Sequence, residues 1–514
     1  MKKIISILLV FATLASCSSI LEEESFSELT PDSFLNNYAE ANQAVIGVYA
    51  MLTEQYYYKQ GFLVVTGYSG DEFYHHVATF ATPFYDGTLA SDNDYVEPLW
   101  DNIAVLRDRA NYAISILEET DKITDDEKQL LIARVKFIRA LNYYNAVRLW
   151  GDIPLLKEYS LEEDDLYPVR TPKFDVYTFI EDDLLEAAHY LPVTETEYGF
   201  PTKGAALGLL AKVHMSQDEW IEANSILNDF FDISTYSLLP NYQDVFNISN
   251  ENNAEEIFAI QFTYDSNNTD FAARGSMMAD YFLPNNIAPI YVNLKTRGQM
   301  ITQHASYDRY VSNDYVTDTR NQIFLTSYPN INNPNATVKR YPDNPNTRTF
   351  GPGCNKYQDP GNSNDRNFNN NLYILRYADI LLMKAEIENE INNGPTTAAY
   401  NAFNEVRLRS NETELETGLS QDEFRDAISD ERGIEFFGEF QRWFDLTRMK
   451  KSNGDSYYKF LKEKVITDGK FNAANGPHNN WAAGYFSKYE LMPIPAAEIR
   501  NNPNISVSNQ NPGY

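Results

Sequence analysis

The chain has 514 residues, of which 42 are Lys or Arg and 73 are Asp or Glu, so its net charge at neutral pH is −31. A surface this acidic repels phosphate, which argues against nucleic acid and against binding to anionic lipid through a basic patch. Hydrophobic residues at 43% and aromatic residues at 14% exclude a disordered chain.

The N-terminus has the pattern of a bacterial lipoprotein signal. Two lysines precede an apolar run over 4–14, which is too short to span a membrane. The sequence Leu-Ala-Ser-Cys at 14–17 resembles a lipobox, in which the cysteine is lipidated. We predict a signal peptide at 1–16, a lipid anchor and linker at 17–30, and membrane attachment only through acyl chains such as palmitate on Cys17. Plain secretory cleavage is the alternative.

Helical periodicity dominates both ends of the chain. Leu131, Val135, Ile138 and Leu141, for example, fall three or four residues apart and form one apolar stripe. Helix pairs of about 34 residues with small residues at the crossing are typical of tetratricopeptide repeats. We therefore predict a mainly α fold with about four such pairs as its scaffold. The expected helices span 34–54, 100–119, 131–149, 176–191, 205–214, 220–231, 377–391 and 397–409.

The middle of the chain has a different composition. Residues 241–371 are rich in Asn, Asp, Pro, Gly and Tyr and show little periodicity, and residues 56–99 are similar. An irregular segment this long inside a compact protein is usually functional. We predict an N-terminal helical region at 31–235 and a C-terminal region at 236–514 that carries the loop-rich insertion and the ligand site.

The composition of these loops suits carbohydrate binding. A sugar has an apolar ring face that packs on an aromatic side chain, and its hydroxyls bond to Asp, Asn or Arg. Trp100 is a candidate because only 5 tryptophans exist and it directly follows the loop at 56–99. Its alternative is a core position in the first turn of a helix. With 36 tyrosines in the chain, any single tyrosine is more often structural than a ligand contact.

The sequence has no recognisable catalytic or metal-binding motif. Glycine-rich phosphate loops, the serine-hydrolase motif and the zinc-protease motif are missing. Asp92-Asn93-Asp94 starts like a calcium loop but lacks its glycine and its closing glutamate. Cys354 has no partner once Cys17 is acylated, so we expect a buried free thiol. We predict a protein that is not an enzyme and has no metal or cofactor.

Six blocks in order resemble the RagB/SusD family of surface lipoproteins, which capture nutrients for a TonB-dependent transporter. The most specific block is Glu-Arg-Gly-Ile-Glu-Phe at 431–436, followed by Arg-Trp-Phe-Asp-Leu-Thr-Arg at 442–448. It departs from the family at Gly433, where a second arginine is common, and we expect this to cost one surface or ion-pair contact. The other blocks lie at 29–34, 133–155, 170–192, 376–409 and 492–495 with 510–514.

The resemblance implies a function and a location. It implies capture of oligosaccharides and their delivery to a partner SusC-like TonB-dependent transporter barrel, which the chain would cover like a lid. It also implies a lipid-anchored protein on the outside of a Bacteroidetes-type outer membrane. The acidic run at 22–24 is similar to the tag that directs lipoproteins to that surface, although an ordinary solvated linker is equally consistent with it.

The resemblance places ligand binding in the variable loops at 60–99 and 265–360. No signature in these loops can be transferred residue by residue, so the candidates are chosen by residue type and position. The predicted ligand-binding residues are Asp71, Tyr85, Trp100, Tyr291 and Arg297.

The charged residues of the signature blocks are predicted to be structural. Arg432 and Glu435, and likewise Arg442 and Asp445, lie three residues apart and are expected to pair on a helix face. Buried pairs of this kind fix the geometry of neighbouring helices more than they add stability.

Three other functions are left open. Capture of oligopeptides for the same kind of transporter is the nearest alternative, because an acidic face accepts basic peptides as well as neutral glycans. An enzyme that cleaves its bound oligosaccharide is the second. A tetratricopeptide adaptor for a protein partner is the third, and both the lipobox and the long insertion argue against it.

Overall fold

The structure is a computed structural model, and the part of the chain that it describes excludes the N-terminus. Cys17 and the acidic run at 22–24 lie outside the described residues, so lipidation stays a prediction. None of the described helices is long and apolar enough to cross a membrane. The described residues are 35–75, 80–86, 88–160, 162, 166–263, 274–288, 291, 296–311, 317–344, 350–361, 367–459 and 490–514.

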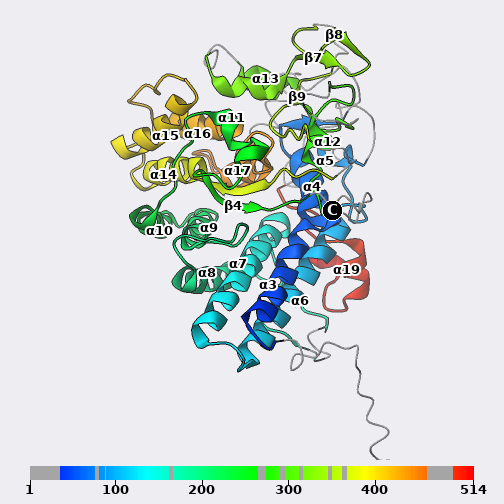
Figure 1. Cartoon of the computed structure of the whole chain (residues 1–514), viewed down its shortest axis with the longest axis vertical. Helices are drawn as coiled ribbons and strands as arrows, with labels where there is room; N and C mark the ends of the chain where they lie inside the picture. Colours follow the sequence, from blue (N-terminus) through cyan, green and yellow to red (C-terminus); the bar gives the residue numbers. More distant parts are fainter. Residues whose placement is uncertain are drawn as a thin grey trace, which may run out of the picture.

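Helices make up most of the molecule, which confirms the predicted mainly α fold (Figure 1). The long helices are α3 (Tyr38–Ala50), α6 (Val96–Glu119), α7 (Asp125–Trp150), α8 (Lys173–Tyr190), α9 (Lys203–Met215), α10 (Trp220–Ile233), α14 (Tyr377–Ile391), α15 (Thr397–Arg409) and α16 (Gln421–Glu435). The short helices are α4 (Gly61–Ser69), α5 (Pro83–Asp86), α11 (Tyr242–Val245), α12 (Met278–Phe282), α13 (His304–Tyr310), α17 (Arg442–Arg448) and α19 (Ala496–Asn501).

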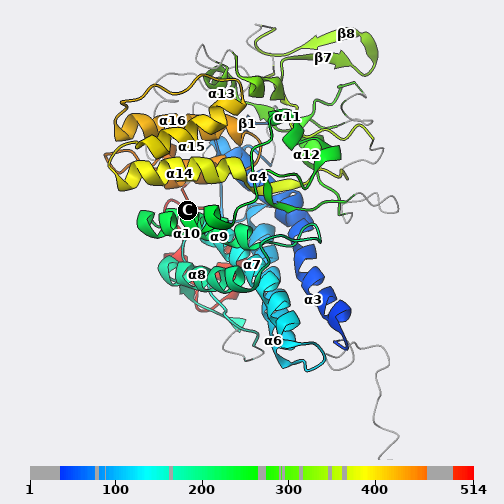
Figure 2. The same cartoon turned by 60° about the vertical axis from the view of Figure 1, so that its left-hand side comes forward.

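The long helices pack as neighbouring pairs. Helix α3 contacts α6, α7 contacts α8, α9 contacts α10, and α14 contacts α15. Contacts between α8 and α9 and between α10 and α14 join successive pairs into one stack, which Figure 2 shows from the side. All eight helices expected from the sequence are therefore present, and they form the expected paired scaffold.

Polar residues at the helix ends explain where the helices start and stop. Thr124 and Ser420 each form a capping box, in which the side chain accepts a bond from the third helical N–H. Gly151 ends α7 with a φ of +73°, as its position in the sequence predicts. Helix α6 starts at Val96, earlier than the expected residue 100, because the Asn93 side chain accepts bonds from the first N–H groups.

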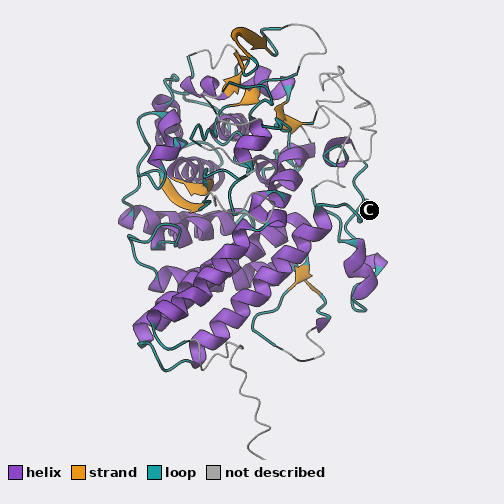
Figure 3. Ribbon diagram, turned by 45° about the vertical axis from the view of Figure 1, so that its right-hand side comes forward, coloured by secondary structure: helices purple, strands orange, loops and turns teal. Residues whose placement is uncertain are grey.

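Within the described residues the strands are short and form five antiparallel two-stranded sheets (Figure 3). The pairs are β1 (Phe73–Tyr74) with β5 (Ile301–Thr302), β2 (Ile153–Pro154) with β3 (Arg170–Thr171), β4 (Glu256–Ile260) with β10 (Leu372–Arg376), β6 (Phe324–Leu325) with β9 (Gly353–Cys354), and β7 (Ser327–Asn330) with β8 (Asn333–Lys339). The insertion at 241–371 thus has more regular structure than expected. Its pairing of β5 with β1 joins it to the loop region at 56–99.

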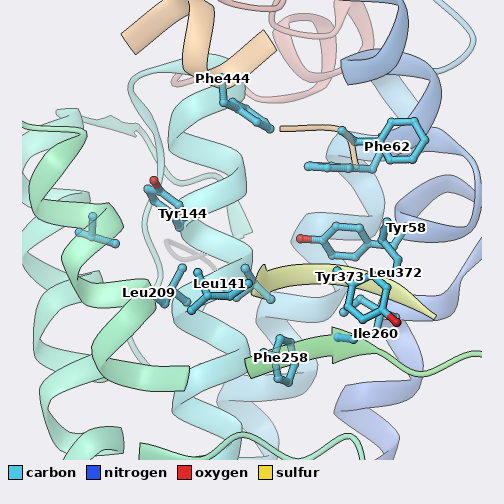
Figure 4. Close-up of a cluster of buried hydrophobic side chains, with 14 of the residues drawn as sticks. Tyr58, Phe62, Leu141, Tyr144, Leu209, Phe258, Ile260, Leu372, Tyr373 and Phe444 are labelled. Carbon is cyan, nitrogen blue, oxygen red and sulfur yellow. The ribbon is translucent and has the colours of Figure 1, made fainter. Parts of the chain in front are cut away.

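One large core connects the two ends of the chain. Figure 4 shows its centre, where side chains from distant segments meet between α7, α9, β4, β10 and α17. The labelled members include Phe62, Leu141, Leu209, Phe258 and Phe444, and all five of these side chains line one small cavity. The predicted boundary between residues 235 and 236 stays a prediction.

The predicted ion pairs of Arg432 with Glu435 and of Arg442 with Asp445 are wrong, because both arginines bond to other carboxylates. Arg432 bonds to Asp379 (2.7 Å) and Asp445 (2.8 Å) instead of Glu435. Arg442 bonds to Asp71 (2.9 Å) instead of Asp445. A buried guanidinium needs several acceptors, which distant segments supply more readily than one turn of a helix.

Glu435 lies at the centre of a largely buried set of charged side chains, which we call the ion-pair core. Its carboxylate accepts bonds from Arg320 (3.0 Å), Arg376 (3.0 Å) and Arg409 (2.6 Å). Burial raises the pKa of Glu435, but the charges of these arginines outweigh it and hold the pKa well below its ordinary value. The remaining members of the ion-pair core are Glu255, Lys356 and Glu439.

Gly433 is a packing position and not the surface or ion-pair site that the sequence suggests. It is buried in α16, and a side chain there would collide with the Tyr310 hydroxyl of α13. The glycine that departs from the family pattern therefore leaves room for the Tyr310 side chain.

Candidate functional site

The loop region at 56–99 and the middle of the insertion come together around helix α4. This helix is buried along its whole length, and the strand pair β1–β5 holds the two regions side by side. At its start, a side chain on Gly61 would collide with the backbone of Tyr56. The close approach at Gly61 lets the tyrosine run fold back over the start of α4.

Six side chains from these segments meet, and we call them the tyrosine cluster: Tyr56, Gln60, Phe80, Tyr95, Tyr281 and Arg297. The rings of Tyr56 and Tyr95 have centroids 6.4 Å apart, and those of Phe80 and Tyr95 are 4.9 Å apart. All three rings are half-buried, so each keeps part of its surface toward solvent. The segments that contribute them, beside α4, α5 and α12, lie together in Figure 1.

Polar groups hold the cluster together from within. The buried Gln60 amide donates to the hydroxyls of Tyr95 (3.1 Å) and Tyr281 (2.7 Å). The Arg297 guanidinium lies 5.2 Å from the centroid of the Tyr281 ring and forms an ion pair with the buried Asp280. Both the rings and the guanidinium are therefore fixed before any ligand arrives, which reduces the entropy that binding costs.

The cluster has the chemistry that binds an uncharged hydroxylated ligand. Burial raises the pKa of the Tyr95 phenol to about 12, so this hydroxyl is neutral and can both donate and accept a hydrogen bond. Arg297 is half-buried and adds N–H donors beside the rings. Aromatic faces with oriented polar groups at their edges are the arrangement that a sugar ring requires.

Two of the predicted ligand residues lie at or beneath the cluster. Arg297 belongs to it directly. Tyr85 is buried, with its hydroxyl donating to the His75 carbonyl (3.3 Å) and its ring 6.3 Å from that of Tyr68. Tyr68 in turn bonds to the Gln299 carbonyl (3.1 Å), two residues from Arg297. Tyr85 therefore supports the cluster from inside the protein.

Asp71 has a structural position. Its two carboxylate oxygens bond to Arg442 (2.9 Å) and Arg309 (2.7 Å), and the residue is 6% exposed. Burial raises the pKa of Asp71, but the two guanidinium charges outweigh it and hold the pKa well below its ordinary value. The carboxylate connects the end of α4 to α13 and α17, and we leave it out of the proposed site.

Trp100 and Tyr291 lie in two other places. Trp100 is 8% exposed, packs edge-on against Trp150 (5.1 Å between centroids) and donates from Nε1 to Glu498 (3.3 Å). It lines a separate cavity of about 120 Å³. Tyr291 is half-buried against a small second hydrophobic cluster that contains Tyr328. The structure thus does not bring the five predicted residues together.

Most residues of the tyrosine cluster cannot be recognised from the sequence. Tyr56 and Tyr95 lie in the loop region that the composition marked, but their ring contacts depend on the fold. Gln60 gives no signal in sequence, since a glutamine is ordinary in any loop or helix. Tyr281 is 221 residues from Gln60, and only the folded chain shows that they bond.

The described residues contain one group that has the ligand types of a metal site. Glu181, His214 and Glu219 have side-chain atoms within 4.8 Å of one another. The Gln217 amide donates to Glu181 (2.5 Å), and His214 bonds to Glu219 (2.7 Å), so contacts within the protein already account for the geometry. We assign no ion to it. Cys354 is a buried free thiol, as expected, and burial raises its pKa to about 12.

The chain is similar to known proteins along most of its length. Residues 254–514 match the model of the SusD family, and residues 19–215 match a model described as starch-binding, associating with outer membrane. The SusD-like protein P25 of Formosa agariphila is 29% identical over 495 residues, which cover 87% of this chain and 89% of that protein.

Two further similarities concern proteins named for glycan binding. The starch-binding protein SusD of Bacteroides thetaiotaomicron is 26% identical, over 77% of this chain and 75% of that protein. The solved structure of surface glycan-binding protein A from the same organism, in complex with laminarihexaose, has a TM-score of 0.71. It is 22% identical and covers 92% of this chain and 99% of that one, so it supports the fold alone.

Proposed function

The chain belongs to the SusD family, and we propose that it is a binding protein, not an enzyme, that captures oligosaccharides at the tyrosine cluster. The observation that carries the proposal is the set of half-buried rings of Tyr56, Phe80 and Tyr95 beside the fixed guanidinium of Arg297. Relatives named for starch and glycan binding support the same class of ligand.

The proposed ligand is neutral. The net charge of −31 disfavours an anionic polysaccharide, because a strongly acidic protein repels it over distances of about a Debye length, ~8–10 Å at physiological salt. The cluster contributes a single partly exposed cation, Arg297, which already pairs with Asp280. The tyrosine cluster is therefore expected to recognise the hydroxyl groups and the apolar ring faces of a sugar.

We further propose that the protein works at the cell surface. It would be held in the outer membrane by acyl chains on Cys17, face the exterior, and deliver its ligand to a SusC-like TonB-dependent transporter barrel. The description of the N-terminal family model, which includes association with the outer membrane, supports the location. The transporter is the element that would move the ligand; this chain would supply capture.

Capture of oligopeptides is the second candidate function. It is favoured by the net charge of −31, which attracts basic peptides as readily as it tolerates neutral sugars. The tyrosine cluster favours sugars, since its rings are half-buried and its polar groups are side chains that match ring hydroxyls.

A binding screen with one variant tests the proposal. Calorimetry of the full chain is run against neutral oligosaccharides, anionic oligosaccharides and basic peptides, and then repeated with Tyr56→Ala. We expect binding to a neutral oligosaccharide, without cleavage, that weakens about tenfold in the variant, as the loss of one stacking ring predicts. Binding of peptides alone would establish the second candidate, and cleavage of the sugar would establish an enzyme.

A further inference from the structure

Two hollows flank the loop at 193–200, which joins α8 to α9. The larger hollow, about 360 Å³, lies between this loop, the second half of α3 and β4. The smaller one, about 190 Å³, lies between the loop and the segment that leads into β4. Both are lined by Tyr198, Gly199, Phe200 and Gln261, so they meet along the loop. None of the tyrosine-cluster residues lines either hollow.

The loop is firmly held at both ends. Glu195 forms an ion pair with Arg134 (2.7 Å) and accepts two backbone N–H bonds of its own loop (2.7 and 3.1 Å). The Phe200 ring packs edge-on against Tyr49, with centroids 5.1 Å apart, and lies 3.8 Å from the guanidinium carbon of Arg134. A loop anchored in this way presents its side chains in one geometry.

Gly199 brings the loop onto the end of β4. Its φ is +93°, and a Cβ at this position would come within 2.9 Å of the Gln261 side chain. The Gln261 amide is itself oriented, because it donates to Glu256 (3.2 Å) and accepts from Asn371 (2.9 Å). The floor between the hollows is therefore a fixed amide and not an adaptable side chain.

Tyr198 stands on this loop with 76% of its surface exposed. A tyrosine side chain has only two rotatable bonds, so it loses little conformational freedom on binding, and it offers a flat apolar face with a polar tip. Tyr49 and Phe200 add half-buried rings in the larger hollow, whose volume falls within the range of about 300–1,000 Å³ typical of small-ligand sites.

We propose that the loop at 193–200 and its two hollows form a second carbohydrate-binding groove, which takes a neutral oligosaccharide with one sugar ring on Tyr198. This inference rests on the proposed function in its ligand class, but it concerns different residues. Three carboxylates (Glu195, Glu197 and Glu256) and one cation (Arg274) line the groove, so its charge disfavours an anionic sugar. The carboxylate oxygens can accept hydrogen bonds from sugar hydroxyls.

A substitution at the exposed ring tests the groove. Tyr198→Ala removes a side chain that makes little contribution to the core, and Tyr190→Ala removes another exposed tyrosine, on the neighbouring α8. Saturation-transfer NMR with maltohexaose and laminarihexaose suits weak binding and is run on the full chain. To weaken the contribution of the tyrosine cluster to binding, each variant is also made in a Tyr95→Ala background.

We expect residual oligosaccharide binding in Tyr95→Ala, a weakening of about tenfold when Tyr198→Ala is added, and no change when Tyr190→Ala is added. Complete loss of binding in Tyr95→Ala alone would overturn the groove while the proposed function stands. Equal binding with and without Tyr198 would also overturn it. Failure of the unmodified chain to bind either sugar or any other neutral oligosaccharide would instead contradict the proposed function, and the groove with it. Binding of basic peptides but not sugars at Tyr198 would overturn the ligand class.

Discussion

The ion-pair core and the tyrosine cluster place arginine in two different settings. In the ion-pair core, the Arg376 guanidinium is fully buried and bonds to Glu255, Glu435 and Glu439. In the tyrosine cluster, Arg297 is half-buried, has one carboxylate partner in Asp280 and lies beside partly exposed rings. The first arrangement fixes helices relative to one another, and the second leaves polar surface beside aromatic faces.

Residue type alone therefore does not identify a ligand contact. Asp71 and Tyr95 both come from the loop region at 56–99, and both suit sugar binding by type. Asp71 is held by two guanidinium groups inside the protein, whereas the Tyr95 ring lies partly at the surface. A side chain can bind a ligand only if it is exposed and if its polar groups are not already fully hydrogen-bonded within the protein.

The largest expected effect comes from breaking the ion-pair core. Arg376→Met leaves the carboxylates of Glu255, Glu435 and Glu439 buried with fewer partners, so we expect a loss of about 3–5 kcal/mol in the free energy of unfolding. Denaturant unfolding measures it. Lys450→Met is the matched control, because its ion pair with Asp218 is about half exposed and should contribute at most about 1 kcal/mol. Equal effects of the two variants would remove the distinction between core and surface pairs.

A pH series tests whether the buried ion pairs of Asp379 stabilise the fold. Burial raises the pKa of this carboxyl, but Lys212 (2.5 Å) and Arg432 (2.7 Å) outweigh it and hold the pKa well below its ordinary value near 4. The charged carboxylate therefore stabilises the fold above about pH 4, and this contribution is lost as the pH falls further. Asp379→Asn should cost about 2–3 kcal/mol at pH 7.

The difference in melting temperature between Asp379→Asn and the unmodified chain should shrink as the pH falls below about 4. Calorimetric scans between pH 3 and pH 8 measure this difference. The range is chosen because it includes the ordinary pKa of an aspartate, near 4. A difference that stays constant over this range would show that the ion pair does not stabilise the fold.

In the tyrosine cluster the expected effect is on binding. Tyr95→Ala removes the ring that contacts both Tyr56 and Phe80, so we expect oligosaccharide affinity to fall about tenfold. The matched control is Tyr112→Ala, an exposed tyrosine on α6. Titration calorimetry measures both. If Tyr112→Ala weakens binding as much as Tyr95→Ala does, the effect is not specific to the cluster.

The smallest effect is expected at Trp100. Trp100→Phe removes the bond from Nε1 to Glu498 but keeps an aromatic ring against Trp150, so stability should fall by about 1 kcal/mol. Oligosaccharide binding should not change, because the cavity of about 120 Å³ beside Trp100 has none of the cluster residues in its lining. A loss of binding in this variant would move the site to Trp100, as the sequence alone suggests.

The helices could be predicted from sequence and the site largely could not. The apolar stripe from Leu131 to Leu141 and the glycine at 151 are local signals, and the structure confirms both. Arg376 and Glu435 are 59 residues apart, so the partners of a buried charge depend on how the helices stack. Spacing within one helix therefore predicts the presence of ion pairs but not their partners.

The same limit applies to the tyrosine cluster. Loop composition drew attention to the region that contains Tyr56 and Tyr95, because aromatic and acidic residues gather there. The contacts from Gln60 to Tyr281 join segments whose distance in sequence carries no information about distance in space. Of the individual candidates, Arg297 lies in the cluster because its position beside α12 is fixed by Asp280.

A crystal structure of the chain with a bound neutral oligosaccharide would show where the ligand lies. We expect a sugar ring against Tyr56 or Tyr95, with a hydroxyl within hydrogen-bond distance of Arg297. A sugar bound elsewhere with the tyrosine cluster empty would contradict this expectation, whatever the affinity of the complex.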